Sequence, residues 1–174
     1  MEPLEILNNK SLKATEQAAL LMVALEKKSL TVQQLLSGID RLKAPMQAKI
    51  LGVLEGATRA QPNLVNTEAM AVVTDCLHSS APSVIRESAR IIANTIHLHT
   101  NCIPDLLPLL IKIAGHEGTV VRWSAATGLN AIAGCAAEAK PLELMLTRLA
   151  AREKQASIVK IYQKALKTLK KRWL

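Results

Sequence analysis

The chain has 174 residues with a formal net charge of +8, and 49% of its residues are hydrophobic against 21% charged. This balance excludes a disordered chain, and the length leaves little room for two large domains. Only 2% of the residues are aromatic and none is Phe, so the core must consist of aliphatic side chains, which favours thin layers of closely packed helices.

The sequence carries no secretion or membrane signal. Its three cysteines, Cys76, Cys102 and Cys135, cannot all pair, and the first ten residues lack a basic stretch followed by an apolar core. We therefore expect reduced thiols in a cytoplasmic protein, with the nucleus as the alternative. The longest apolar run, Ala18 to Leu25, is far below the roughly 20 residues that span a bilayer, so we expect no membrane insertion.

Helical spacing of apolar residues, interrupted by Gly, Pro, Ser and Asn, divides the chain into antiparallel helix pairs. In chain order the expected pairs span about residues 3–28, 31–60, 64–98, 104–136 and 141–172. The first helices of the first two pairs are short, at 3–7 and 32–39; those at 64–78, 104–114 and 141–152 are longer. No β-branched run alternates long enough to predict a strand.

The second helices repeat one another. The stretch from Thr119, TVVRWSAATGLNAIA, matches SVIRESARIIANTIH from Ser83 in kind, and both Ser83 and Thr119 are predicted as N-cap residues. A basic residue recurs at the corresponding place in every pair, with intervals of 36, 37, 36 and 38: Lys13, Lys49, Arg86, Arg122 and Lys160. A period of this size indicates stacked helix pairs, because one pair cannot bury its apolar faces alone.

Residues 106–133 resemble the HEAT-repeat family, which is armadillo-like: Pro108 lies inside the first helix, and Val121–Arg122 opens an Ala-rich second helix. The resemblance implies an all-α fold, a right-handed α-α superhelix of about five pairs in one repeat domain over 1–174. It also implies a concave face lined by the second helices. The family often has Asp in the turn, paired with Arg of a neighbouring repeat. Here the turns contain Ser79, Ser80, His116 and Glu117 instead, so the sequence does not establish these Asp–Arg pairs. A compact helical bundle is the alternative.

Polar and basic residues on the second helices form the predicted partner-binding face. Arg86, Arg90 and Asn94 recur every four residues and so share one side of a helix. An Arg-rich row suits a carboxylate-bearing protein segment or a phosphate backbone, and Trp123 beside Arg122 suits a binding hot spot. The complete predicted set is Lys49, Arg86, Arg90, Asn94, Arg122, Trp123, Asn130, Lys160 and Lys164. Alternatively, these side chains make contacts between repeats or form a solvent-exposed surface without a partner-binding role.

Most of the net charge lies at the C-terminal end. Residues 152–174 contain eight Lys and Arg against Glu153 alone. Four of them, spaced by 4, 3 and 4 residues, form one helical stripe: Lys160, Lys164, Lys167 and Lys171. This stripe predicts an anion or nucleic-acid site whose affinity depends on salt. The alternative is a polar cap on the terminal repeat.

Nothing in the sequence predicts catalysis, a cofactor or a metal. There is no nucleophile elbow, phosphate-binding loop or HExxH motif, and Asp75, Glu87, Asp105 and Glu117 are isolated acids. The stretch HLHTNC, residues 97–102, offers His97, His99 and Cys102 near Cys76 and His78, but without a CxxC or HxxxH pair. We therefore expect no metal site.

These observations favour a non-catalytic interaction or scaffold module that holds a protein segment on a mildly basic concave face, and the basic residues favour an acidic segment. The alternative is a nucleic-acid-binding protein. HEAT-like DNA glycosylases that remove alkylated bases belong to that alternative, although they rely on Trp and Asp residues around the lesion, and no such combination surrounds Trp123.

Overall fold

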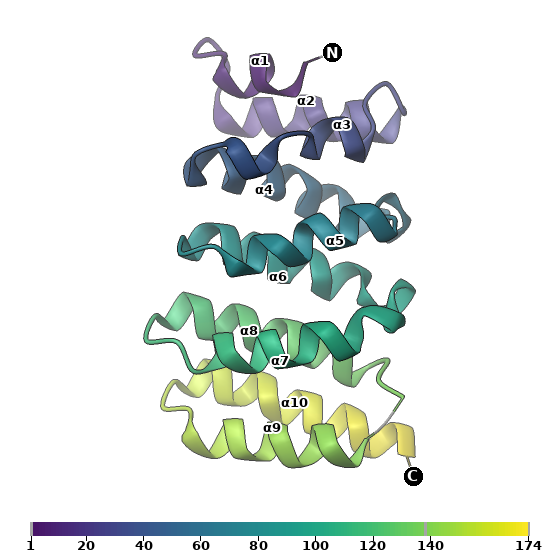
Figure 1. The fold of residues 1–174 in the computed structure, drawn as a ribbon, viewed down its shortest axis with the longest axis vertical. Helices are drawn as coiled ribbons and strands as arrows, with labels where there is room; N and C mark the ends of the chain where they lie inside the picture. The colour runs from purple at the N-terminus through teal and green to yellow at the C-terminus, as the bar shows by residue number, and fades with distance from the viewer. Residues whose placement is uncertain (1, 138, 174) are drawn as a thin grey trace. The chain divides into compact units, whose positions relative to one another are not determined.

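The computed structural model describes residues 2–137 and 139–173, except for the side chain of Trp173. These residues form α-helices and short 3-10 turns, with no strand among them (Figure 1), which confirms the predicted all-α class. The helices are α1 Pro3–Asn8, α2 Ala14–Glu26, α3 Val32–Leu36, α4 Ala44–Ala60, α5 Thr67–Asp75, α6 Pro82–Thr95, α7 Ile103–Ala114, α8 Thr119–Ala133, α9 Lys140–Arg152 and α10 Ala156–Trp173.

The chain divides into two compact units, Met1–Ile91 and Ile92–Leu174, and α6 crosses the boundary. In the first unit α1 packs on α2, α2 packs on α4, and α3 contacts both α4 and α5. Its core is aliphatic, as the composition requires, with Leu21, Leu51 and Leu54 fully buried. Each such side chain contributes about 1.5–3 kcal/mol through removal from water.

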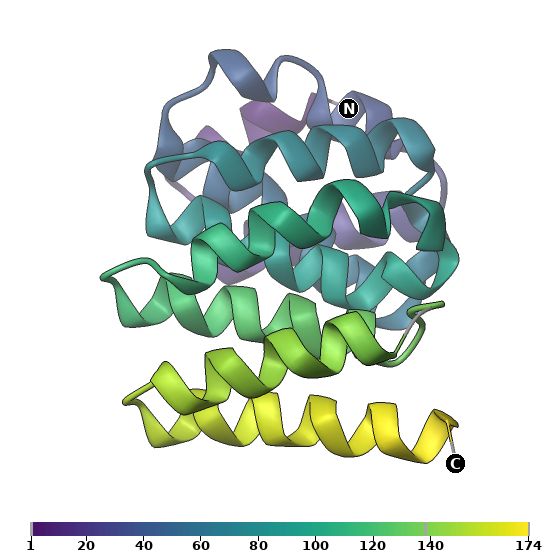
Figure 2. The same ribbon diagram turned by 60° about the horizontal axis from the view of Figure 1, so that its bottom comes forward.

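In the second unit α8 is the central helix, because it packs against both α7 and α10. Small residues make this possible: a Cβ on Gly128 would lie 3.1 Å from Leu110 Cδ1, so α7 and α8 approach closely there. Helices α9 and α10 also pack on each other and lie side by side (Figure 2). Arg172 Nη1 donates to the carbonyl oxygens of Ala133 and Ala136, at 3.2 and 3.0 Å, and so caps the C-terminal end of α8.

Both predicted N-cap residues differ from the structure, and α5 begins at Thr67, three residues later than predicted. Ser83 and Thr119 are not N-caps, because α6 begins at Pro82 and α8 begins at Thr119 itself. Proline suits the first helical position, since its fixed φ is helical and its missing N–H would be unpaired there. At α8 the N-cap is Gly118, without a side-chain cap hydrogen bond.

Helix α3 is shorter than the predicted 32–39 and ends at Leu36. Gly38 adopts a left-handed conformation with φ of 67°, which no helix accommodates, and a 3-10 turn, Ile39–Arg41, follows. The same segment borders a groove of about 720 Å³ beside α5 whose lining residues include Asp40, Glu68 and Asp75. No sequence pattern described above predicts this groove.

Candidate partner-binding surfaces

In the first unit a network of arginines and glutamates links α4 to α6. Glu55 of α4 binds Arg59 one turn later, at 2.8 Å, and Arg90 of α6, at 3.0 Å. Glu87 binds Arg90 at 3.4 Å and Arg86 at 2.6 Å. Both carboxylates are buried. Buried charges require such partners, so these arginines neutralise the interior acids of this unit.

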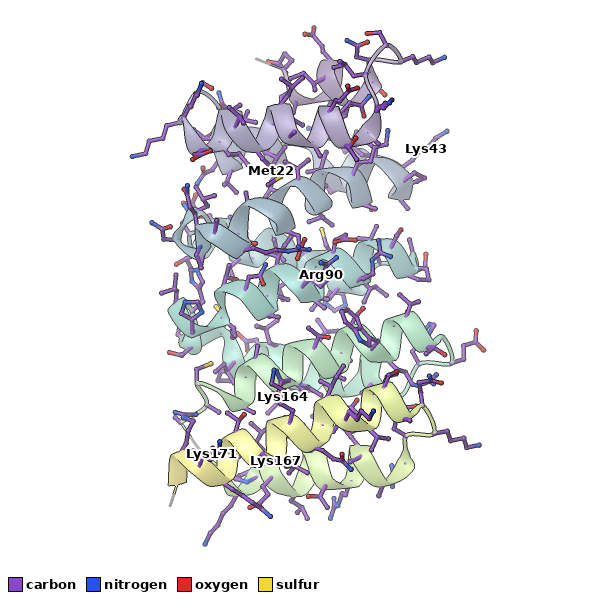
Figure 3. All side chains as sticks on the ribbon, turned by 180° about the vertical axis from the view of Figure 1, so that it is seen from behind. Met22, Lys43, Arg90, Lys164, Lys167 and Lys171 are labelled. Atoms are coloured by element: carbon purple, nitrogen blue, oxygen red, sulfur yellow. The ribbon has the colours of Figure 1, made fainter. Side chains whose placement is uncertain are left out.

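The network changes what two predicted binding residues do. Arg90, labelled in Figure 3, has a side chain that is 29% exposed, and its guanidinium bridges two carboxylates. Arg86 is more exposed but is paired with Glu87. Glu87 is therefore not the isolated acid that the sequence analysis inferred. Glu55 and Arg59 were missed, although their four-residue spacing is the usual signal of a helical ion pair.

Two more predicted residues, Lys49 and Asn94, lie on α4 and α6. Lys49 is exposed, and its Nζ donates to the carbonyl oxygen of Leu7 at 3.3 Å, which links α4 to α1. Asn94 is half-buried near the end of α6. Lys49 therefore makes a contact between helix pairs, which is the alternative to partner binding given above.

In the second unit Arg122 joins α8 to the turn after α9. Its Nε and Nη2 donate to the two carboxylate oxygens of Glu153, at 2.9 and 3.3 Å. Its Nη1 donates to the carbonyl oxygens of His116 and Glu117, at 3.1 and 2.6 Å. The hydrogen bond from Arg122 lowers the pKa of Glu153. An acid–base bridge between neighbouring helix pairs is therefore present here, with Glu153 as the acid.

Trp123 and Asn130 lie half-buried on α8. They differ by seven residues, two helical turns, and so share one side of the helix. The Asn130 Oδ1 atom is buried and has no hydrogen-bond partner among the described residues, which leaves one acceptor unsatisfied on this side. The other tryptophan, Trp173, has a side chain outside the described residues.

The predicted lysine stripe is exposed along α10. Lys160, Lys164, Lys167 and Lys171 all face solvent, and none makes an ion pair among the described residues. The opposite side of the helix is buried through Ile158, Tyr162, Ala165 and Leu169. Figure 3 shows Lys164, Lys167 and Lys171 along this helix. We call these four residues the α10 lysine stripe.

In residues 2–137 and 139–173 no group of three or more His, Cys, Asp or Glu side chains is arranged to hold a metal ion. His97 is exposed whereas His99 is buried, so the two histidines of HLHTNC do not converge. Burial raises the pKa of the Cys76 thiol to about 11, which makes it a poor nucleophile or ligand near neutrality.

None of the helices in the part of the chain that the structure describes has the length and apolar content needed to cross a bilayer.

No protein-family model and no curated protein matches the sequence. Among solved structures, a designed armadillo repeat protein in complex with the peptide (KR)4 is similar, with a TM-score of 0.66, 17% identity, and coverage of 96% of this chain and 73% of that one. Computationally designed armadillo repeat proteins for modular peptide recognition give 0.68 and 19%, covering 88% and 68%. Another designed armadillo repeat protein gives 0.68 and 18% with the same coverage. The chain therefore has an armadillo/HEAT-like helical repeat fold, an all-α superhelix.

Proposed function

We propose that the chain is a non-catalytic interaction module that binds an acidic protein segment on the exposed side of α8 and α10. One observation carries this proposal: the α10 lysine stripe has no carboxylate partner among the described residues, whereas Arg86, Arg90 and Arg122 are held in ion pairs. The similar structures that were designed to bind peptides add support, because the same fold can present a peptide-binding surface.

Charge supports the choice of an acidic partner. Residues 92–174 contain twelve Lys and Arg against five Asp and Glu, and neither α8 nor α10 contains an acidic residue. Residues 1–91 are almost balanced, with ten basic and nine acidic residues. The lysines and arginines of α8 and α10 would therefore attract an acidic segment, and no carboxylate of these helices would repel it. This attraction also speeds association.

Each residue of the proposed face has a separate part. Lys160 and Lys164 supply charge to carboxylates of the segment. Trp123 supplies apolar contact area, and the half-buried Asn130 offers its side-chain amide to the segment. Arg122 holds α8 against the turn at Glu153 and supports the face without contacting the segment.

In the first unit, Arg90 likewise has a structural role, because it binds Glu55 of α4 and Glu87 of α6. Lys49, Arg86 and Asn94 are not part of the proposed face on α8 and α10. Their substitution is expected to weaken binding less than that of Lys160 or Lys164, because Arg86 and Lys49 already have partners within the unit.

Binding of a fluorescent Glu- and Leu-containing peptide tests the proposal. We expect Lys160→Glu with Lys164→Glu to weaken binding by about tenfold or more, since like charges replace attraction. The matched control is Lys112→Glu with Lys140→Glu, which makes the same change in net charge at exposed positions on α7 and α9. The control should stay within about twofold of wild type. Equal losses in both variants would show that only net charge matters and would contradict a localised face.

Nucleic-acid binding is the second candidate, and the α10 lysine stripe is the observation that favours it. Lys171 is eleven positions after Lys160, so the stripe extends for about 16 Å along the helix and matches several successive phosphates. A mobility-shift assay across a salt series should then show log affinity falling with log salt at a slope of about −3 to −4. No shift at low salt would eliminate this candidate. Base excision is not part of it, because α8 has no carboxylate beside Trp123.

A further inference from the structure

The second unit contains a pocket of about 400 Å³ where the C-terminal ends of α7 and α9 meet the first half of α10. Its lining includes the buried Tyr162 of α10, the apolar side chains of Ile111 and Leu149, and the Arg122–Glu153 pair. Arg152 and Lys154 lie at its edge, on either side of Glu153. On α10, Tyr162 belongs to the buried side opposite the α10 lysine stripe, so the pocket is a separate feature.

The Tyr162 hydroxyl is the unusual group in this pocket. The residue is only 1% exposed, and its hydroxyl oxygen is buried with no hydrogen-bond partner among the described residues. Burial raises its pKa to about 12, with Glu153 as the next contribution, so it is a neutral donor at physiological pH. Buried hydroxyls normally have a partner, and a donor of this kind beside a pocket calls for an acceptor from a ligand.

The charges around this hydroxyl favour an anionic acceptor. Glu153 does not accept from this hydroxyl, which has no hydrogen-bond partner among the described residues; Arg122 binds both Glu153 oxygens, and the Gln155 N–H donates to Oε1 at 2.8 Å. The Arg122–Glu153 pair is close to neutral, whereas Arg152 and Lys154 are exposed or at the pocket edge and make no ion pair among the described residues. The pocket therefore combines two positive charges, on Arg152 and Lys154, with one neutral donor, the Tyr162 hydroxyl.

We propose that this Tyr162 pocket binds a single carboxylate of a peptide. Tyr162 donates a hydrogen bond to one carboxylate oxygen, Arg152 and Lys154 provide the positive charge, and Ile111 and Leu149 contact the aliphatic carbons that carry the group. A monoanion fits better than a phosphate dianion, because the nearby Glu153 carboxylate opposes a second negative charge and the Arg122 guanidinium has no free edge for bidentate binding. The carboxylate comes from an acidic side chain or from a chain terminus.

NMR of the ring of Tyr162 tests the proposal, since it is the chain's single tyrosine. The intact chain, labelled at tyrosine, is titrated with three capped tripeptides: Leu-Glu-Leu with an amidated end, Leu-Gln-Leu with a free carboxyl end, and Leu-Gln-Leu with an amidated end. We expect saturable shifts of the ring signals with at least one of the first two peptides, and that peptide identifies the source of the carboxylate. The third peptide should leave the signals unchanged.

Substitutions assign the binding to the pocket. Tyr162→Phe keeps the ring and removes the hydroxyl; because it also removes the labelled tyrosine, its binding is followed by the backbone amide signals of α10, recorded for wild type as well. We expect about fivefold weaker binding with unchanged or slightly raised thermal stability. Arg152→Gln with Lys154→Gln should weaken binding by about tenfold, whereas Lys140→Gln, exposed at the start of α9, should bind like wild type. Equal shifts with the amidated Gln peptide, no shift with either carboxylate, or full affinity in Tyr162→Phe would overturn the proposal.

This pocket stands independently of the proposed function. The Lys160→Glu, Lys164→Glu variant should lose the acidic segment on the exposed side of α10 and keep the Tyr162 response to the carboxylate tripeptides. If the stripe binds nothing, the tripeptide result is still expected. If the same variant also abolishes the tripeptide response, the binding is a general effect of charge and the pocket proposal fails.

Discussion

Individual residues explain why a recurring basic position is not by itself a binding site. Arg122 occupies the recurring basic position of α8, and Arg90 lies one turn after that position in α6, which Arg86 occupies. Arg122 and Arg90 each close an ion pair with a glutamate from another helix pair, Glu153 and Glu55, whose side chains are less than 7% exposed. Both arginines are therefore required to neutralise buried acids, whereas the lysines along α10 make no such ion pair among the described residues.

Arg90→Met removes one guanidinium from between Glu55 and Glu87 while keeping much of the side-chain volume. Because Arg59 and Arg86 still bind these carboxylates, we expect an intermediate loss of about 2 kcal/mol in the free energy of unfolding, measured by urea denaturation. Lys49→Met, which removes a single exposed contact to a carbonyl oxygen, should change it by less than about 0.5 kcal/mol. Equal effects would contradict a structural role for Arg90.

Stability at alkaline pH reports on two buried groups. The pKa values of Cys76 and Tyr162 rise from 9.0 and 10.0 to about 11 and about 12, chiefly through burial. The folded chain thus holds protons that the unfolded chain releases, so stability falls as pH rises through the window from about 9 to 12. Tyr162→Phe should flatten the decline above pH 10 in urea denaturation. An unchanged slope in this variant would contradict the buried, neutral hydroxyl.

At the scale of helices, contacts between small residues decide where substitutions are tolerated. Gly128 in α8 lies against Leu110 of α7, with 3.1 and 3.2 Å from an added Cβ to the two Leu110 methyl carbons. Gly52 in α4 has nothing within 4 Å of an added Cβ. Gly128 therefore permits close packing of α7 and α8, whereas Gly52 only lowers the stability of α4.

We expect Gly128→Val to destabilise the chain by about 1–3 kcal/mol, because the larger side chain must displace Leu110 or separate α7 from α8. Gly52→Ala should stabilise it by about 0.5–1 kcal/mol, since alanine loses less backbone freedom in a helix. Thermal unfolding of the two variants checks both signs. A destabilising Gly52→Ala, or a neutral Gly128→Val, would show that the helix packing described here is wrong.

The sequence predicts the helices better than it predicts which side chains meet when the helices pack. The repeated apolar spacing and the period of the basic positions depend on neighbouring residues, so the all-α repeat fold is accessible from sequence. The end of α3 depends on one glycine conformation, and α6 begins at Pro82, two residues before the start implied by a Ser83 N-cap. The pairing of Arg122 with Glu153, 31 residues away, and the isolation of the Tyr162 hydroxyl arise only once helices pack.

Over the whole molecule, the dominant feature is the uneven distribution of charge between the two units. Residues 92–174 carry nearly all of the net charge of +8. A terminal cap needs polarity for solubility but no particular sign, whereas α10 has only cations among its charged residues. We therefore infer that the charge of α10 serves recognition in addition to solubility.

Amide and side-chain NMR mapping with a Glu- and Leu-containing peptide tests the central proposal most directly. The account predicts that the largest shifts fall on one side of α8 and α10, at Trp123, Asn130, Lys160 and Lys164, and that they diminish as salt rises. Shifts centred on α4 and α6 around Arg86 and Arg90, or no shifts at low salt, would contradict it.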